Sequence, residues 1–336
     1  MPVLWLGFIV CAGLIVYCGT KLSRYGDVIA EKTGLGHAWT GLLLMAGITS
    51  LPELINGISS VTIAGVPDIA LGDIMGSCMF NILIIAVMDM LLGRQQVFSG
   101  ADKSHFLSLG FGMILIGIVS VSILLPDMPP IGPVGIYTPV IALIYLAGIK
   151  SVWLFEKKRA APSPAVITAD ARYGHITLRK AVSRYSLNAA VIVVAATILP
   201  FIGERLAQQT GLGDSFFGTF FVGIATSLPE LVVSISALHI GATQMAIANL
   251  FGSNMFNILI VAIDDIFYAG GGLLSVVSTG HAMTGLIAII MSAIALFGLT
   301  YRPKKKIFLI LGWDSASIVL AYVIGIFSLY SLSAAG

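Results

Sequence analysis

The stretch Thr49-Ser-Leu-Pro-Glu-Leu54 decides the fold, because it recurs in the second half of the chain as Thr226-Ser-Leu-Pro-Glu-Leu231. A second motif follows each copy: Gly76-Ser-Cys-Met-Phe-Asn-Ile-Leu-Ile84 corresponds to Gly252-Ser-Asn-Met-Phe-Asn-Ile-Leu-Ile260. Chance similarity between apolar helices does not reproduce Pro, Glu, Ser and Asn in register. The chain therefore consists of two related halves.

The composition indicates that lipid is the main solvent of this chain. Of its 336 residues 57% are hydrophobic and 10% are charged, whereas soluble domains carry about 25% charged residues. So few charges do not cover a water-facing surface, which excludes a water-soluble enzyme. Nothing suggests nucleic-acid binding. Neither a disulfide framework nor a metal cluster is indicated by the three cysteines, which all lie in apolar stretches: Cys11, Cys18 and Cys78.

Ten apolar runs approach or exceed the length of about 20 residues that a membrane-spanning helix needs. They cover residues 2–20, 38–64, 68–92, 104–125, 132–154, 186–203, 215–241, 244–268, 280–300 and 307–331. Five spans per half is an odd number, so the second half enters the membrane in the opposite orientation. We therefore predict an all-α integral membrane protein with two inverted five-helix repeats. The repeats cover residues 1–154 (core about 41–84) and 186–336 (core about 218–260), joined by a basic linker over 155–185.

The positive charges predict the orientation of these spans. When connections are placed alternately on the two sides of a plasma (inner) membrane, only Arg205 of the 18 Lys and Arg residues falls opposite the others. Because cytoplasmic loops attract positive charge, we expect a cytoplasmic linker and both termini outside. The remaining residues leave no room for a large regulatory domain.

Two glutamates carry the strongest functional signal. Glu53 and Glu230 lie within apolar runs at matching repeat positions, and a carboxylate at membrane depth is tolerated when it faces a cavity, a partner or an ion. Pro52 and Pro229 precede them, and each removes a helix hydrogen bond and so breaks helix 2 or helix 7. Freed backbone carbonyls are tolerated at membrane depth where they are buried or line a cavity.

The polar side chains near these glutamates offer oxygen atoms. Thr49 and Ser50 lie within one turn of Glu53, and helix 3 places Ser77 and Asn81 on one face. The second repeat supplies the equivalent Thr226, Ser227, Ser253 and Asn257. No thiolate or imidazole occurs in both repeats, so the set favours a hard cation such as Ca²⁺ or Na⁺ over zinc or copper.

The doubled motifs resemble the two alpha-repeats of the calcium/cation antiporter superfamily, which contains the Na⁺/Ca²⁺ exchangers. The resemblance implies that alternating Ca²⁺ and Na⁺ binding falls to Thr49, Ser50, Glu53, Ser77, Asn81, Thr226, Ser227, Glu230, Ser253 and Asn257. It also implies coordinating backbone carbonyls near Ala46 and Gly223.

The chain departs from that pattern at several positions. Some sodium-coupled members have an Asp where this chain has Asn257, which leaves the driving ion open. Asp73 lies one turn before Ser77, where the second repeat has Asn249, and is a candidate for the ion path. Cys78 stands where the second repeat has Asn254, and we expect only a local packing effect there.

The remaining acids receive less weight. We expect a solvated, interfacial role for Asp89, Asp264 and Asp265, which lie at the ends of helices 3 and 8. Asp314 lies in helix 10 without an evident partner.

These features favour an antiporter that exchanges Ca²⁺ for Na⁺ by alternating access, with no cofactor besides the transported ions. Ca²⁺/H⁺ exchange through the same paired glutamates is the close alternative, and a cation channel is a remote one. An intramembrane aspartyl protease is disfavoured, because Ala70-Leu-Gly-Asp73 matches its active-site element only faintly and the second repeat has Asn249 instead.

Overall fold

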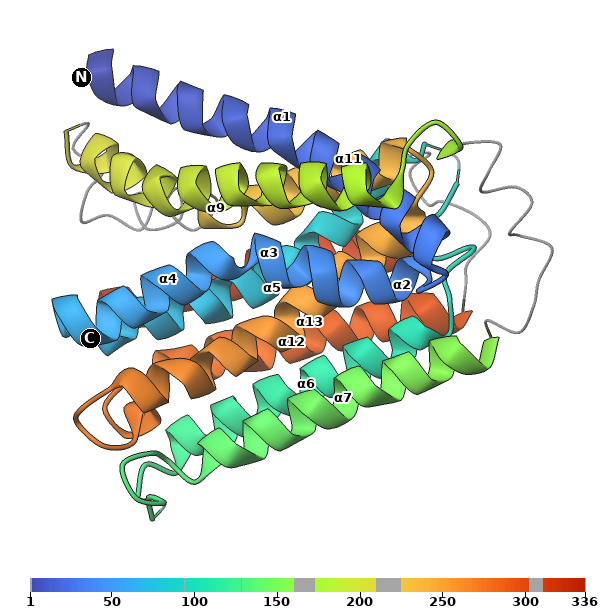
Figure 1. Cartoon of the computed structure of the whole chain (residues 1–336). Coiled ribbons are helices and arrows are strands. Elements are labelled where there is room, and N and C mark those ends of the chain that lie inside the picture. Colours follow the sequence, from blue (N-terminus) through green and yellow to red (C-terminus); the bar gives the residue numbers. More distant parts are fainter. Residues whose placement is uncertain are drawn as a thin grey trace. The chain divides into compact units, whose positions relative to one another are not determined.

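The computed structural model describes residues 2–93, 95–127, 129–159, 173–209, 225–301 and 311–335 (Figure 1). Within these ranges the regular structure is helical, apart from an isolated bridge between Ile131 and Val134. Nine of the described helical segments are long and apolar enough to cross a membrane, and a shorter apolar helix covers Leu228–His239. The prediction of an all-α membrane protein is confirmed.

The longer helices follow the predicted spans in order. They are α1 (Pro2–Thr33), α5 (Pro67–Leu91), α6 (Ser104–Leu124), α7 (Tyr137–Arg159), α9 (Leu178–Gln209), α11 (Leu228–His239), α12 (Thr243–Phe267), α13 (Gly280–Tyr301) and α14 (Trp313–Ala335). The second span is built from consecutive short pieces: α2 (His37–Trp39), the π-helix η1 (Thr40–Met45), α3 (Ala46–Thr49), α4 (Leu51–Ser59) and the π-helix η2 (Ser60–Ala64). A short 3₁₀ turn, η3 (Leu273–Ser275), precedes α13.

Two helices extend well beyond the apolar runs that predicted them. The first run ends near residue 20, yet α1 continues through Lys21, Arg24 and Lys32 to Thr33. Helix α9 likewise begins at Leu178 and ends at Gln209. Lys, Arg, Glu and Gln are good helix formers, so a helix continues after its apolar section has ended. Hydropathy therefore locates the apolar section of a helix more reliably than the ends of the helix.

Both repeat motifs contain a break in the helix. Helix α3 ends at Thr49 and α4 begins at Leu51, while Ser50 has backbone angles φ −93° and ψ 4°. In the second repeat Ser227 has nearly the same angles, φ −85° and ψ 8°, just before α11 begins at Leu228. The prolines two residues further on have no backbone N–H to extend the preceding helix. The predicted breaks in helices 2 and 7 are thus present at equivalent serines.

The chain divides into two compact units, which are not the two sequence repeats. Unit 1 comprises Met1–Pro52, Asp102–Ser108 and Ile149–Ser253, and unit 2 comprises Glu53–Ala101, Leu109–Gly148 and Asn254–Gly336. Each unit combines helices from both halves of the chain. The division passes through one copy of each motif, between Pro52 and Glu53 in the first repeat and between Ser253 and Asn254 in the second.

In unit 1, α1 packs along α9 and against α11 (Figure 1). A buried apolar cluster joins α1 to α9 and to the residues before α11: Cys11, Ile15, Ala195, Ala196, Leu199 and Ala225. Gly19 permits the close approach of α11, since a Cβ atom there would lie 2.7 Å from Cγ1 of Val232. Ser23 adds a polar link by donating a hydrogen bond of 2.8 Å to the carbonyl of Val233. Unit 1 thus positions α11, which carries Glu230.

In unit 2, α5 packs against α13 and α14, and α13 packs against α14. Helix α5 is buried over most of its length, as expected for a helix surrounded by protein rather than lipid. Gly325 of α14 lies against side chains of both neighbours, because a Cβ atom there would be 2.7 Å from Ile287 and 3.2 Å from Met79. Unit 2 thus positions α5, which carries Ser77 and Asn81.

Candidate cation-binding site

The polar residues selected from the sequence fall into two clusters, one within each unit. Unit 1 holds Thr49, Ser50, Thr226, Ser227, Glu230, Asn249 and Ser253, and unit 2 holds Glu53, Asp73, Ser77, Asn81 and Asn257. All of these side chains are buried except Asp73, which is partly exposed. Each cluster contains one of the two glutamates.

In unit 1, a residue of the first repeat contacts the glutamate of the second. The hydroxyl of Ser50 donates a hydrogen bond of 3.2 Å to Oε1 of Glu230. Glu230 is fully buried, and it lies in the first turn of α11. A carboxylate is stabilised at the positive end of a helix dipole and by a hydroxyl donor. The break at Ser50 therefore directs a donor toward the charge of the other repeat.

Thr49 belongs to the same cluster. Its Oγ1 lies 3.4 Å from Oγ of Ser253 and donates a hydrogen bond of 3.3 Å to the carbonyl oxygen of Ala46. The Ala46 carbonyl, which was expected to coordinate an ion, also accepts the Ser50 N–H at 3.0 Å. Gly223, its expected counterpart, lies outside the described residues.

Two glycines allow η1 to approach α12 closely enough to form this cluster. A Cβ atom on Gly41 would lie 2.3 Å from the carbonyl oxygen of Met245, and a Cβ atom on Gly252 would lie 2.6 Å from that of Leu42. Both distances are far below van der Waals contact, and both neighbours are backbone atoms. Any side chain at either position would separate the two helices and move Ser253 away from Thr49.

Asn249 brings a further polar contact to unit 1. Its Nδ2 donates a hydrogen bond of 3.0 Å to Oγ of Ser234, a residue that the sequence analysis did not select. Within the described part of the chain the Asn249 amide oxygen has no hydrogen-bond partner, although it is buried. Since buried polar atoms are nearly always satisfied, this oxygen is available to a ligand.

In unit 2, Ser77 is the hydroxyl that faces the first glutamate. Its Oγ lies 3.5 Å from Oε1 of Glu53, at the long limit of a hydrogen bond. Glu53 is 1% exposed and Ser77 3%. The two residues come from α4 and α5, so this pair joins both motifs of the first repeat, whereas the Ser50–Glu230 pair joins the two repeats.

Asn81 is held by Asn254, which the sequence analysis did not include in the site. The Asn81 amide donates a hydrogen bond of 3.0 Å to Oδ1 of Asn254, whose own amide donates to the carbonyl of Cys78 at 3.1 Å. This bond uses the backbone carbonyl of residue 78, which any side chain leaves in place, so the local packing effect expected of Cys78 stays a prediction. Among the described residues the Asn81 amide oxygen has no hydrogen-bond partner.

Unit 2 contains two further acidic residues near α4, Asp73 and Asp264. Oδ2 of Asp73 accepts a hydrogen bond of 2.7 Å from Nδ2 of Asn56. Asp264 lies against Gly57 on the neighbouring turn, since a Cβ atom there would meet Oδ2 of Asp264 at 2.3 Å. Asp264 is fully buried, so its predicted solvated position was wrong. An acid inside the apolar run of α12 was the signal for its burial, and its place near the helix end obscured it.

Asp89 and Asp265 are also buried, contrary to prediction, and both hold loops in place. Asp265 accepts hydrogen bonds from the Gly135 and Leu273 N–H groups at 2.8 and 2.6 Å, from the Tyr137 hydroxyl at 2.5 Å, and from Thr138. Asp89 accepts the N–H groups of Val97 and Gly312 at 3.1 and 2.9 Å. Each carboxylate accepts hydrogen bonds from buried loop N–H groups that would otherwise lack an acceptor. Some of these N–H groups lie far from the carboxylate in sequence.

Asp314 is buried beside two glycines. A Cβ atom on Gly298 or Gly312 would lie 2.5 or 2.3 Å from its carboxylate oxygens. Asp314 therefore lies where α13 packs against α14, and it belongs to neither repeated motif.

The chemistry of the two clusters is uniform. Each cluster contains carboxylate, hydroxyl and amide oxygens, the kinds of ligand that hard cations prefer. Buried carboxylates in the apolar helices of a membrane protein need a counter-charge. The helical membrane fold and the buried oxygen ligands are those expected of a membrane transporter of inorganic cations.

Comparison with known proteins gives the family. A model described as "Sodium/calcium exchanger protein" matches residues 3–149 and 186–331. The chain therefore belongs to the sodium/calcium exchanger family of calcium/cation antiporters. The two matched segments fall on the two halves identified from the repeat.

Individual relatives agree with this assignment. The inner membrane protein YrbG of Escherichia coli is 27% identical over 252 residues, which are 74% of each chain. The sodium/calcium exchanger MaX1 of Methanosarcina acetivorans is 34% identical over 140 residues, 41% of this chain and 37% of that protein. A structure of the sodium-calcium exchanger NCX_Mj superposes with a TM-score of 0.73 at 19% identity, covering 98% of this chain and 100% of that one. The fold is thus that of the exchanger.

Proposed function

We propose that this protein exchanges Ca²⁺ for Na⁺ across the membrane by alternating access. The observation that carries the proposal is the burial of Glu53 and Glu230, each facing a serine hydroxyl from another helical segment. A buried carboxylate without a cation would be costly in a lipid-embedded protein. Transported ions supply that charge in turn.

The charge of the two glutamates accounts for the coupling of fluxes. When both are ionised they carry two negative charges, which one Ca²⁺ or two Na⁺ neutralise. Ions that need the same carboxylates compete for them, and this competition links the movement of one ion to that of the other. Further Na⁺ would rely on hydroxyl, amide and carbonyl oxygens.

Sodium is the favoured driving ion because of the neutral oxygens. The hydroxyls of Thr49, Ser50 and Ser77 lie beside the glutamates or beside Ser253, and the buried amide oxygens of Asn81 and Asn249 are free to accept a cation within the described residues. A site that binds protons alone has no need of such a shell. Ca²⁺/H⁺ exchange remains the second candidate, since the two Glu carboxylates can also bind protons and the two Asn add no further charge.

The residues proposed to bind cations are the ten side chains chosen from the repeats, and Asp73 and Asn249 are proposed for the ion path. Asn257 is buried one helical turn after Ser253 and belongs to the set. Orientation in the plasma (inner) membrane follows the positive charges, with a cytoplasmic linker and both termini outside. The partners are the lipid bilayer and inorganic cations.

Uptake of ⁴⁵Ca²⁺ into liposomes that contain the purified protein tests the proposal. One sample carries an outward Na⁺ gradient and another an outward H⁺ gradient. Glu53→Gln and Glu230→Gln remove one charge each at nearly constant volume, and Glu204→Gln makes the same change at an exposed position of α9.

Sodium-driven uptake that both site variants abolish and Glu204→Gln preserves is the expected result. Uptake driven only by H⁺ would replace the sodium-coupled function with the second candidate. Calcium flux independent of both gradients, or full uptake in either site variant, would overturn the antiporter mechanism proposed for the glutamates.

A further inference from the structure

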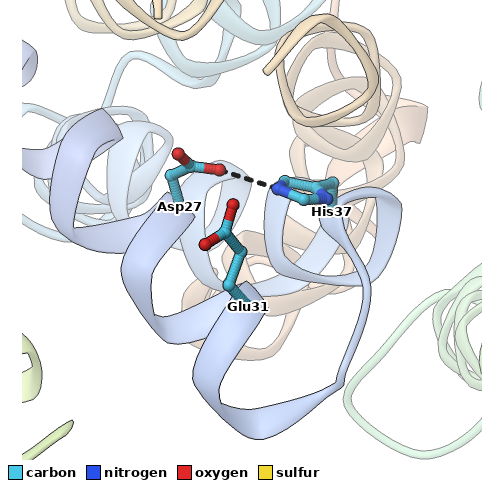
Figure 2. Close-up of side chains that lie close together, drawn as sticks. All are labelled: Asp27, Glu31 and His37. Carbon is cyan, nitrogen blue, oxygen red and sulfur yellow. Dashed lines mark hydrogen bonds and ion pairs between the residues drawn. The ribbon is translucent and has the colours of Figure 1, made fainter. Parts of the chain in front are cut away.

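A second group of metal-ligating side chains lies in unit 1, where α1 ends and α2 begins. Asp27 and Glu31 are one turn apart on α1, and His37 is the first residue of α2 (Figure 2). Gly34 and Gly36 have positive φ angles of 68° and 82°, which residues with a Cβ atom rarely adopt. These glycines turn the chain sharply enough to bring His37 back to the preceding helix.

The three side chains point toward one another (Figure 2). Nε2 of His37 lies 2.7 Å from Oδ1 of Asp27, and one ligand atom from each of the three residues lies within 4.8 Å of the other two. In the described part of the chain, this is the one group of three or more His, Cys, Asp or Glu residues with such spacing. Ligands about 2 Å from a tetrahedral ion are roughly 3.3 Å apart, so small side-chain rotations suffice to enclose one.

The surroundings of the group hold its ligands in place. Asp27 is 1% exposed, and its second oxygen accepts a hydrogen bond of 2.6 Å from the Tyr173 hydroxyl. Such outer contacts orient a metal-binding carboxylate. Glu156 of α7 brings another carboxylate near, because a Cβ atom on Gly36 would lie 2.8 Å from its Oε2. The His37 side chain is 36% exposed, so water and ions reach the group.

We propose that Asp27, Glu31 and His37 bind a divalent transition-metal ion of the zinc type. The imidazole nitrogen separates this group from the two oxygen-only clusters, because Zn²⁺, Co²⁺ and Ni²⁺ accept imidazole readily whereas Ca²⁺ and Mg²⁺ prefer oxygen. The bound ion connects the end of α1 with α2, which continues directly into η1 and the Thr49–Ser50 break. Metal binding would therefore stabilise the part of unit 1 that carries the Ser50–Glu230 contact.

Spectroscopy and calorimetry on the purified full-length chain test the proposal. Co²⁺ reports its ligands through visible absorption, and Zn²⁺ titration gives stoichiometry and affinity. Excess Ca²⁺ is present in a parallel titration, to occupy the proposed transport site. His37→Ala, Glu31→Gln and Tyr173→Phe are compared with His281→Ala. His281 forms a similar pair with Asp68, at 2.9 Å, without belonging to a group of three metal-ligating residues in the described part of the chain.

The expected result is one Zn²⁺ per chain, not displaced by Ca²⁺, with a cobalt spectrum that Zn²⁺ abolishes. Affinity should fall at least tenfold in His37→Ala and Glu31→Gln, and about tenfold in Tyr173→Phe, which alters only an outer contact. His281→Ala should bind as the wild type does.

Absence of saturable Zn²⁺ binding to the wild-type chain would overturn the proposal. Unchanged binding in both His37→Ala and Glu31→Gln would also overturn it, since the metal would then bind elsewhere. Calcium transport measured on the same samples shows that each variant is folded, and Glu31→Gln serves where His37→Ala is too unstable to purify.

Discussion

The hydroxyl of Ser50 donates a hydrogen bond to Oε1 of Glu230 over 3.2 Å, so the helix break of the first repeat contacts the glutamate of the second. A hydrogen bond within unit 1 thus joins the two repeats. The breaks at Ser50 and Ser227 have similar backbone angles. The following predictions depend on contacts of this kind.

Ser50→Ala should weaken calcium transport more than its small change in volume suggests. Only a contact that is stronger in the ion-bound state than in the ion-free state raises affinity. A difference of about 1.5–3 kcal/mol, the range for a hydrogen bond to a charged group, corresponds to an apparent Ca²⁺ affinity about 10- to 100-fold lower in Ser50→Ala. The concentration dependence of ⁴⁵Ca²⁺ uptake measures this. Thr62→Ala is the control, because Thr62 is exposed and its hydroxyl donates to the carbonyl of Ile58, one turn earlier in the same span. Equal affinity in Ser50→Ala and the control would contradict a role for this bond.

Gly252→Ala and Gly76→Ala should differ in their effect on stability, although each glycine is the first residue of its copy of the repeated motif. A Cβ atom at Gly252 would lie 2.6 Å from a backbone oxygen, whereas none of the described atoms lies within 4 Å of a Cβ atom at Gly76. Overpacking costs about 1–3 kcal/mol, and alanine is otherwise favourable in a helix. Thermal unfolding in detergent should show a lower Tm for Gly252→Ala and an unchanged or higher one for Gly76→Ala. The reverse order would show that the helix crossing is misplaced.

Asp265→Ala should destabilise the protein by on the order of 2 kcal/mol or more, because it leaves the buried N–H groups of Gly135 and Leu273 without their acceptor. Asp127→Ala removes an exposed carboxylate and should leave Tm nearly unchanged. The ion dependence of transport in Asp265→Ala should stay that of the wild type in the folded fraction. A changed driving ion would instead place Asp265 on the ion path.

Asp73→Asn should slow ⁴⁵Ca²⁺ uptake, since Asp73 is a partly exposed carboxylate on the helix that carries Ser77. Negative charge along a path raises the local cation concentration, and its removal should reduce the uptake rate at low Ca²⁺ about tenfold. Asp68→Asn, at the exposed first turn of the same helix, is the matched control. Equal rates in both variants would leave Asp73 a structural role through its bond to Asn56.

The sequence by itself determined the membrane environment, the two related halves, the breaks near Pro52 and Pro229, and a set of oxygen ligands suited to cations. These properties depend on local hydropathy, proline chemistry and repetition, which are present in the chain before it folds. The tertiary structure decided that Ser50 contacts Glu230, that Asn254 holds Asn81, that Asp264 and Asp265 are buried, and that His37 meets Asp27. Those outcomes depend on helix packing and on glycines that permit close backbone approach or a tight turn. Residues distant in sequence become neighbours only through such packing, so no local pattern predicts their contacts, whereas the burial of Asp264 had a local signal in the apolar run around it.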